Sequence, residues 1–213
     1  AALLTASLVR AQTAEIADPW SRLPGILAGI RAPVFPDRDF SITSFGAKPD
    51  GASDATGAFR RAIAECVRSG GGRVVAPAGE FLTGPIHLKS GVNLHLQKGA
   101  TVRFSTDPNH YLPVVNYSPL IYALGQENIA VTGEGTLDGQ ASDENWWKWK
   151  GRSTPAPGTQ RADRDRLFQQ AEDGVPVDQR VYGAGHFLRP SFIEPYESRN
   201  IVIEGMTIRN APF

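Results

Sequence analysis

The amino-acid sequence predicts an all-β solenoid, a single-stranded parallel β-helix that begins with a capping α-helix. Three observations predict it: a strand phrase that occurs three times, a second short strand after each copy, and one amphipathic helix before them all. Each copy has an apolar segment opened by proline, a short polar corner, and an asparagine that leads an alternating strand. The copies are Pro85–Leu88 with Asn93–Leu96, Pro119–Tyr122 with Asn128–Val131, and Pro190–Ile193 with Asn200–Ile203.

The length of the repeated unit indicates how it folds. A unit of two or three short strands cannot bury its own apolar face, whereas stacked copies can. Strand-only repeats of about 20 ordered residues favour a parallel β-helix over a helical array. The second strands are Thr101–Phe104, Gly135–Leu137 and Met206–Ile208.

The residues before the first copy divide into a possible targeting segment and a leader. Residues 1–14 resemble the remnant of a secretory signal peptide, because a small-residue cleavage pattern follows the apolar run Ala1–Val9; a short buried or disordered segment is the alternative. Residues 15–39 carry apolar side chains at helical spacing until prolines end the pattern. Phe40–Phe45 alternates as a strand. Residues 15–213 are therefore expected to hold the cap and the first coils of one domain.

An amphipathic helix is predicted over residues 54–69. Ser53 or Asp54 is a good N-cap, one apolar stripe follows, and three glycines end the helix. Because a solenoid exposes its core and strand edges at an open end, we expect this helix to cover that end. The one cysteine, Cys66, lies on the apolar stripe and is expected to be a small core residue.

Two longer segments, residues 105–117 and 140–188, interrupt the repeats. Each leaves the solenoid after a second short strand and returns at a proline-led strand, so both are expected at the same corner of successive coils. They should stack on one side and overhang one face, which is where repeat proteins usually bind ligands.

Composition limits the class of partner. The chain of 213 residues has 22 Lys and Arg against 22 Asp and Glu, and this neutral total gives no support for nucleic acid or an anionic membrane. No apolar run is long enough to span a bilayer. A neutral total remains compatible with a local basic cluster that binds an acidic ligand.

Arg189 is the most suggestive candidate for ligand binding. It heads the third proline-led strand, where Ser118 and Gly84 are expected to hold the matching places. A single arginine in a row of small residues, beside the overhanging segments, suits bidentate capture of a carboxylate. The alternative is a solvated arginine that pairs with Glu194 or Glu197.

His186 and Trp147 are further candidates. His186 lies just before Arg189 and is placed either to line a groove or to hold structure. Trp147 belongs to a cluster with Trp146 and Trp149; flat aromatic faces suit sugar rings, whereas buried ones would anchor a long loop. We expect at least two of the three tryptophans to be anchors.

The acidic residues show no paired arrangement of the kind that sugar hydrolysis uses. Asp50 and Asp138 lie in Asp-Gly turns, which explain them. Asp163, Asp165 and Asp173 are scattered through what reads as a polar loop. The sequence contains no zinc, EF-hand, P-loop or dinucleotide motif.

Five segments and two short motifs occur in a specific order. They are Phe45–Gly51, residues 70–79, Leu82–Ser90, Leu94–Ala100, Gly133–Gly139, Trp146-Trp147-x-Trp149 and Leu188-Arg189-Pro190. This set, from about Trp20 to Phe213, resembles the N-terminal part of bacterial glycoside hydrolase family 28, the polygalacturonase family. The first segment with its helix is shared by many pectin-lyase-like proteins.

The resemblance implies a right-handed, pectin-lyase-like β-helix that hydrolyses α-1,4-linked galacturonate with inversion. One carboxylic acid would protonate the leaving oxygen while other carboxylates activate water on the opposite face. The implied partners are acidic polysaccharides, namely pectin, polygalacturonate and oligogalacturonides, met by Arg189, His186 and Trp147. The resemblance implies no cofactor and no metal, and a secreted or periplasmic location.

The sequence departs from the family at two points. The family's Asn-x-Asp, Asp-Asp, His-Gly and Arg-x-Lys motifs do not occur in it, which implies that the catalytic acids lie beyond Phe213 and that this is an N-terminal portion. Bacterial relatives usually carry extra residues near Val115-Asn116, so either the first excursion forms a shorter wall or residues are absent from the sequence at this point.

Two alternatives keep the fold and change the function. A non-catalytic β-helix that binds polysaccharide, such as an adhesin or a tailspike, would use the same cap and coils, because fold does not set function. A pectate lyase would use calcium and a base for β-elimination, and it would need a carboxylate cluster for the ion. Absorbance from a new double bond in the product separates a lyase from a hydrolase.

Overall fold

The computed structural model describes residues 18–112, 118–151 and 158–213, and the chain divides into two compact units, Ala1–Arg31 and Ala32–Phe213. The first unit contains a 3-10 helix, η1 (Pro19–Arg22), and a short helix, α1 (Leu23–Gly29). The helical spacing of the leader is therefore confirmed. The signal-peptide prediction for residues 1–14 and the departure at Val115-Asn116 lie outside the described residues.

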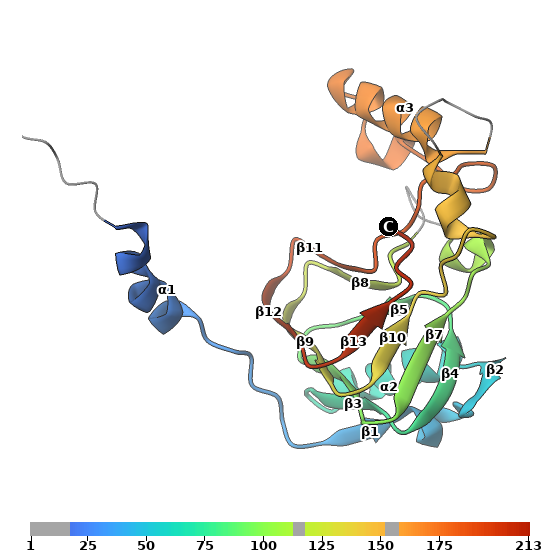
Figure 1. The fold of residues 1–213 in the computed structure, drawn as a ribbon. Helices are drawn as coiled ribbons and strands as arrows, with labels where there is room; N and C mark the ends of the chain where they lie inside the picture. The colour runs from blue at the N-terminus through green and yellow to red at the C-terminus, as the bar shows by residue number, and fades with distance from the viewer. Residues whose placement is uncertain (1–17, 113–117, 152–157) are drawn as a thin grey trace, which may run out of the picture. The chain divides into compact units, whose positions relative to one another are not determined.

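The second unit consists of three parallel sheets, here named A, B and C (Figure 1). Sheet A contains β1 (Asp39–Ser41), β3 (Gly72–Ala76), β6 (Val92–Leu96), β9 (Glu127–Gly133) and β12 (Arg199–Glu204). Sheet B contains β2 (Asp50–Asp54), β4 (Gly79–Thr83), β7 (Ala100–Phe104), β10 (Thr136–Asp138) and β13 (Thr207–Arg209). Sheet C contains β5 (Ile86–His87), β8 (Ile121–Leu124) and β11 (Ile193–Tyr196). From β3 onward the chain visits A, B and C in turn, so successive coils lie on one another and the predicted parallel architecture is confirmed.

The core consists of apolar columns that run from coil to coil. In sheet B, Phe81 is level with Val102 and Val102 with Leu137, and all three side chains are fully buried. Sheet A has a similar column through Val74, Leu94 and Val131. Because paired strands are about 4.8 Å apart, side chains that point inward at the same level pack directly against each other. The alternating apolar pattern of the sequence thus becomes one continuous core.

The register of the repeats differs from the sequence alignment. In sheet C, Ile86 pairs with Ile121 and Ile121 pairs with Ile193, so the leading prolines stand one, two and three residues before the paired position. Packing of the isoleucines against the core sets the pairing, with Ile86 and Ile121 fully buried and Ile193 partly so, while proline lacks an N–H and needs only to precede the strand. The prolines therefore do not stack, and the predicted match of Arg189 with Ser118 and Gly84 is wrong.

The asparagines of the second and third copies do stack. Asn200 Nδ2 donates to Asn128 Oδ1 at 3.1 Å, and both residues have a φ of 54°. Asn93 instead pairs with Ala130, and the corner in its coil is made by Gly91, with a φ of +76°. The corner from sheet C to sheet A needs a left-handed residue, and glycine or asparagine supplies it at low cost.

The amphipathic helix is α2 (Thr56–Arg68), with Ala55 as its N-cap. The N-cap prediction of Ser53 or Asp54 is wrong because the end of β2 takes both residues into sheet B, although the Asp54 carboxylate still accepts from the Thr56 N–H at 2.9 Å. The buried face of α2 contains Phe59, Ile63 and Cys66, and the helix contacts β1, β3, β5 and β6. Phe40–Phe45 is only partly a strand, since β1 gives way to the 3-10 helix η2 (Ile42–Phe45).

Both excursions join sheet B to sheet C, as predicted, because β7 pairs with β10 and β8 pairs with β11. The first contains η3 (Pro108–Tyr111), and the second contains η4 (Trp146–Lys150), α3 (Gln160–Glu172) and η5 (Val177–Gln179). They lie against each other where the rings of Tyr111 and Trp146 meet edge to face at 5.9 Å. The prediction of a polar loop around Asp163 and Asp165 is wrong, because both residues lie on α3. This helix has no apolar stripe, so the sequence shows no helical periodicity from which to predict it.

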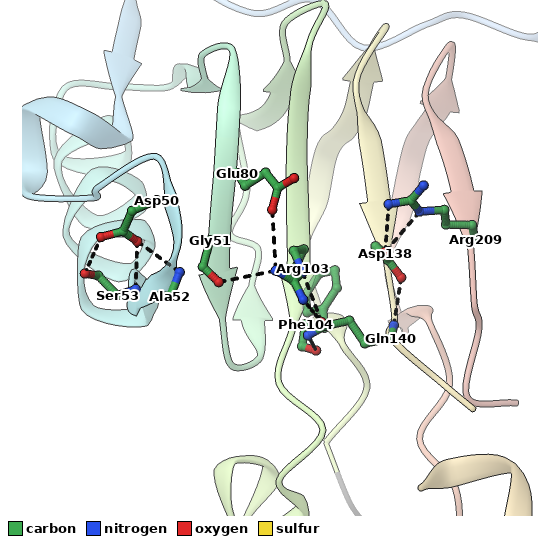
Figure 2. A network of polar contacts seen from close by, with 10 residues as sticks. All are labelled: Asp50, Gly51, Ala52, Ser53, Glu80, Arg103, Phe104, Asp138, Gln140 and Arg209. Carbon is green, nitrogen blue, oxygen red and sulfur yellow. Dashed lines mark hydrogen bonds and ion pairs between the residues drawn. The ribbon is translucent and has the colours of Figure 1, made fainter. Parts of the chain in front are cut away.

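Polar contacts tie the coils together on the outer face of sheet B (Figure 2). The Arg103 side chain bonds to Gln140 Oε1 through Nε at 3.0 Å and to the Gly51 carbonyl through Nη1 at 3.4 Å. Asp138 accepts from Arg209 Nη2 at 2.9 Å and from Asn210 Nδ2 at 2.9 Å. The turn therefore explains Asp138 only in part, because its carboxylate also holds the next coil.

Asp50 is explained by its turn, as predicted. Its carboxylate accepts from the Ser53 N–H at 2.8 Å, the Ser53 hydroxyl at 2.7 Å and the Ala52 N–H at 3.0 Å, and these bonds lower its pKa to about 2. Within the described residues, no helix has the length and apolar character needed to cross a membrane.

Gly133 is predicted to be the least replaceable corner residue. It has a φ of +116°, and a β-carbon there would lie 2.0 Å from the Leu96 carbonyl oxygen of the preceding coil. Gly133→Ala should lower the free energy of unfolding by about 3 kcal/mol, because overpacking adds to left-handed strain. Gly125→Ala is the matched control, since Gly125 has a φ of +62° with nothing within 4 Å. Equal losses in denaturant titrations of the two variants would contradict the close-approach argument.

Asp138 is predicted to stabilise the coil stack in a pH-dependent way. Burial alone would raise the pKa of Asp138, but bonds from Asn210 and the Gln140 N–H, with the Arg209 charge, outweigh it and lower the pKa. Its stabilisation is therefore present above the unfolded-state pKa of about 3.9 and is lost as the pH falls through the folded-state pKa.

At pH 7, Asp138→Asn should destabilise the fold by about 1–3 kcal/mol. The difference from wild type, measured by denaturant unfolding, should shrink at pH 3. Asp143→Asn, at an exposed position, is the control for the loss of one charge. A difference in unfolding free energy that stays constant between pH 7 and pH 3 would contradict a stabilising role for the ionised Asp138 carboxylate.

Candidate functional site

The candidate site lies where the second excursion returns to sheet C. Arg189 is partly buried there and makes three contacts. Its Nε donates to Gln160 Oε1 at 3.0 Å, its Nη1 donates to the Pro212 carbonyl at 2.8 Å, and its guanidinium lies 5.0 Å from the ring centre of Phe213. These contacts fix the plane and direction of the guanidinium.

Among the described residues, no carboxylate forms an ion pair with Arg189. In the described part of the chain, Arg189 forms no ion pair with Glu194 or Glu197, so the alternative of a solvated arginine paired with one of these glutamates is wrong. The two glutamates lie on β11 and at the corner after it, whereas Arg189 bonds to α3 and to residue 212. Burial lowers the pKa of Arg189. A partly desolvated guanidinium held only by neutral partners is suited to an external carboxylate.

His186 is held by an acidic partner. Its Nδ1 lies 2.7 Å from Asp163 Oδ1, while Asp163 Oδ2 accepts from the Phe187 N–H at 2.6 Å. The imidazole also packs edge to face on Tyr182, with ring centres 5.0 Å apart. These contacts order the segment that leads into Arg189, so the geometry favours a structural part for His186.

The first turn of α3 positions both residues. Gln160 holds Arg189 and Asp163 holds His186, and these two residues are three apart on the helix, which puts them on one face. Reasoning from the sequence missed Gln160 and Asp163 because α3 carries no amphipathic pattern. The one available signal is the run of good helix formers from residue 160 to residue 172.

The three tryptophans divide as expected, with at least two of them anchors. Trp146 and Trp149 are 1% and 7% exposed and pack edge to face at 4.8 Å, and Trp149 meets Phe187 at 5.4 Å. Trp147 is 39% exposed, and its Nε1 donates to the Ala211 carbonyl at 2.9 Å. The exposed indole is available as a platform for a sugar ring.

Arg189 and Trp147 meet at one segment of main chain. They bond to the adjacent carbonyls of Pro212 and Ala211, although 42 residues separate them in the sequence. The structure therefore brings together a directed cation and an exposed aromatic face. This pair can bind a carboxylated ring, but it supplies neither a nucleophile nor a general acid. Among the described residues, no cluster of three His, Cys, Asp or Glu side chains is placed to hold a metal ion.

Comparison with known proteins shows strong likeness to polygalacturonases. The exopolygalacturonase of Thermotoga maritima superposes on 89% of this chain with a TM-score of 0.84 and 46% identity, and the match covers 46% of that protein. A probable polygalacturonase of Vitis vinifera is 29% identical over 79% of this chain and 36% of its own length. The family 28 exopolygalacturonase of Yersinia enterocolitica shares the fold, with a TM-score of 0.57 and 24% identity over 84% of this chain and 36% of that protein.

The chain thus spans less than half the length of these relatives. No family model matches it. The ordered motifs, the parallel coils and the 46% identity to a solved exopolygalacturonase agree with one another. The chain is polygalacturonase-like and resembles glycoside hydrolase family 28 in both its sequence and its fold.

Proposed function

We propose that this chain belongs to a glycosidase that hydrolyses polygalacturonate, and that it supplies the scaffold and part of the substrate-binding surface. The observation that carries the proposal is Arg189, a partly buried guanidinium with neutral protein partners on the side that carries both excursions. Galacturonate offers one carboxylate on each sugar ring, so a polymer of it meets such a cation at regular intervals. The names of the relatives support the choice of substrate.

Binding at this site divides between two side chains. The Arg189 Nη2 atom donates no hydrogen bond to any described residue, so it is available to a carboxylate oxygen together with the remaining Nη1 hydrogen. The Trp147 ring would pack against the apolar face of a neighbouring sugar. His186 would act indirectly, through Asp163 and the segment that presents Arg189.

Hydrolysis itself is assigned to carboxylic acids outside the described residues. An inverting glycosidase needs one acid to protonate the leaving oxygen and a carboxylate base to activate water on the opposite face, about 6.5–9.5 Å away. Neither Asp50 nor Asp138 is suited to this, since hydrogen bonds and Arg209 hold them as structural carboxylates.

We further propose that the three sheets close into a right-handed β-helix and that α2 caps its first coil. Supporting this, the buried face of α2 joins the same core as the columns of sheets A and B, and the helix contacts strands of both sheet A and sheet C. Pectin degradation outside the cytoplasm, in a secreted or periplasmic setting, fits a substrate too large to enter a cell.

Arg189→Ala is predicted to weaken binding of trigalacturonate at least tenfold. The loss of a charge-assisted pair costs about 1.5–3 kcal/mol. Calorimetric titration of the chain measures the change, with trigalactose as the neutral ligand that should not bind. The affinity of Arg189→Lys for trigalacturonate should lie between those of wild type and Arg189→Ala, because lysine keeps the charge and loses the bidentate geometry.

Arg164→Ala is the matched control, since Arg164 is an exposed arginine on α3 of the same excursion. Melting temperatures of all variants should stay near that of wild type. Unchanged trigalacturonate binding together with a melting temperature lowered by several degrees would identify Arg189 as a structural residue and refute the proposal.

A further inference from the structure

A second cleft lies at the opposite end of the coil stack, between α2, β5 and η3. Its volume is about 420 Å³, within the range typical of small-molecule sites. Its floor is apolar and buried, formed by Phe59, Ile63 and Ile86. Basic side chains surround this floor: Arg60 from the helix, Lys89 and His87 near β5, and His110 from η3.

The two long cations of this cleft, Arg60 and Lys89, have no ion-pair partner among the described residues. No acidic residue lines the cleft, and the two cations also form no side-chain hydrogen bond with the described residues. Within the described ranges, the one ion pair of a lining residue is a long one, with His110 Nε2 at 3.8 Å from Asp107 Oδ2. Burial, and then the charge of Lys89, lower the pKa of His87, so the positive charge of the cleft belongs to Arg60 and Lys89. Such a cleft attracts an anion.

The walls of the cleft are held in place before any ligand arrives. The Thr56 hydroxyl accepts from the Gly84 N–H at 2.7 Å, which joins the start of α2 to the corner between sheets B and C. A β-carbon at Gly84 would lie 3.7 Å from that of His110, so η3 lies directly over this corner. His87 packs edge to face on Tyr122 at 5.8 Å. The geometry is therefore preorganised, which lowers the cost of binding.

We propose that this cleft is a second uronate-binding site, distinct from the one at Arg189. The carboxylate would lie between Arg60 and Lys89, and the apolar face of the sugar ring would rest on Phe59 and Ile63. The choice of a uronate rests on the proposed function, whereas the anion site itself rests on the cleft alone.

The separation from Arg189 follows from the register. The cleft includes Ile86, which is level with Ile121 and then Ile193, so two coil steps of about 4.8 Å each separate the matching strands. Arg189 precedes the last of these strands. Arg189 and the cleft therefore face different coils, and a chain of several sugars is long enough to reach both.

Amide chemical shifts of the chain, titrated with digalacturonate, test the proposal. The Gly84 and Leu88 amides, beside the cleft, should shift in wild type and in Arg189→Ala. The double variant Arg60→Ala/Lys89→Ala should need at least tenfold more digalacturonate for the same shift, while Lys98→Ala, which removes an exposed lysine elsewhere, should match wild type. Galactobiose at equal concentration should leave both amides unmoved, and inorganic phosphate, which lacks the sugar ring that rests on the apolar floor, should shift them less than digalacturonate does.

Three results would overturn the site: Gly84 and Leu88 shifts that survive in the double variant, equal shifts with galactobiose, or equal shifts with phosphate. A fourth, loss of the Gly84 shift in Arg189→Ala, would show that the cleft is not a separate site. If digalacturonate shifts the Gly84 amide, but its binding outside the cleft is the same in wild type and in Arg189→Ala, the proposed function at Arg189 fails while the proposal for the cleft stands.

Discussion

The structure depends on one constraint, the in-register stacking of parallel coils. Each coil must follow the path of the one before it, because its strands pair about 4.8 Å away and its inward side chains pack level with those of its neighbour. The columns through Val102 and Val131 satisfy this in the core. At the corners, the same path demands the same backbone conformation, which is why Gly91, Asn128 and Asn200 all have positive φ.

That constraint decides where extra chain can be added. Inserted residues within a strand would shift the register of every column, whereas residues inserted at a corner leave the strands in place. Both excursions lie at the corner from sheet B to sheet C, so the buried core is preserved while one side of the stack acquires long segments. Arg189 and Trp147 stand at the end and near the start of the same excursion and meet at the main chain of residues 211 and 212. The scaffold thus makes a site from residues that are distant in sequence.

The sequence predicts most of the scaffold and less of the site. Alternating apolar residues predicted the strands and the buried stripe of α2, because burial is a periodic signal. The proline and Asn93 alignments failed, since pairing follows the isoleucines that pack against the core and the left-handed corner rather than residue identity. The helix α3 was missed because a polar helix leaves no periodic pattern, and with it Gln160 and Asp163, which position Arg189 and His186. Long-range contacts of this kind have no local signature.

We expect ligand binding on the side of the stack where the corner from sheet B to sheet C lies, and not on its other faces. The outer face of sheet A offers an alternative binding site, a cleft of about 500 Å³. Its lining includes Arg73, Asn93, His95 and Thr132. Hydrogen exchange of the chain with and without trigalacturonate compares the two most directly. We expect slower exchange in residues 158–192 and 84–89, with sheet A unchanged. Protection confined to β3, β6 and β9 would contradict this expectation.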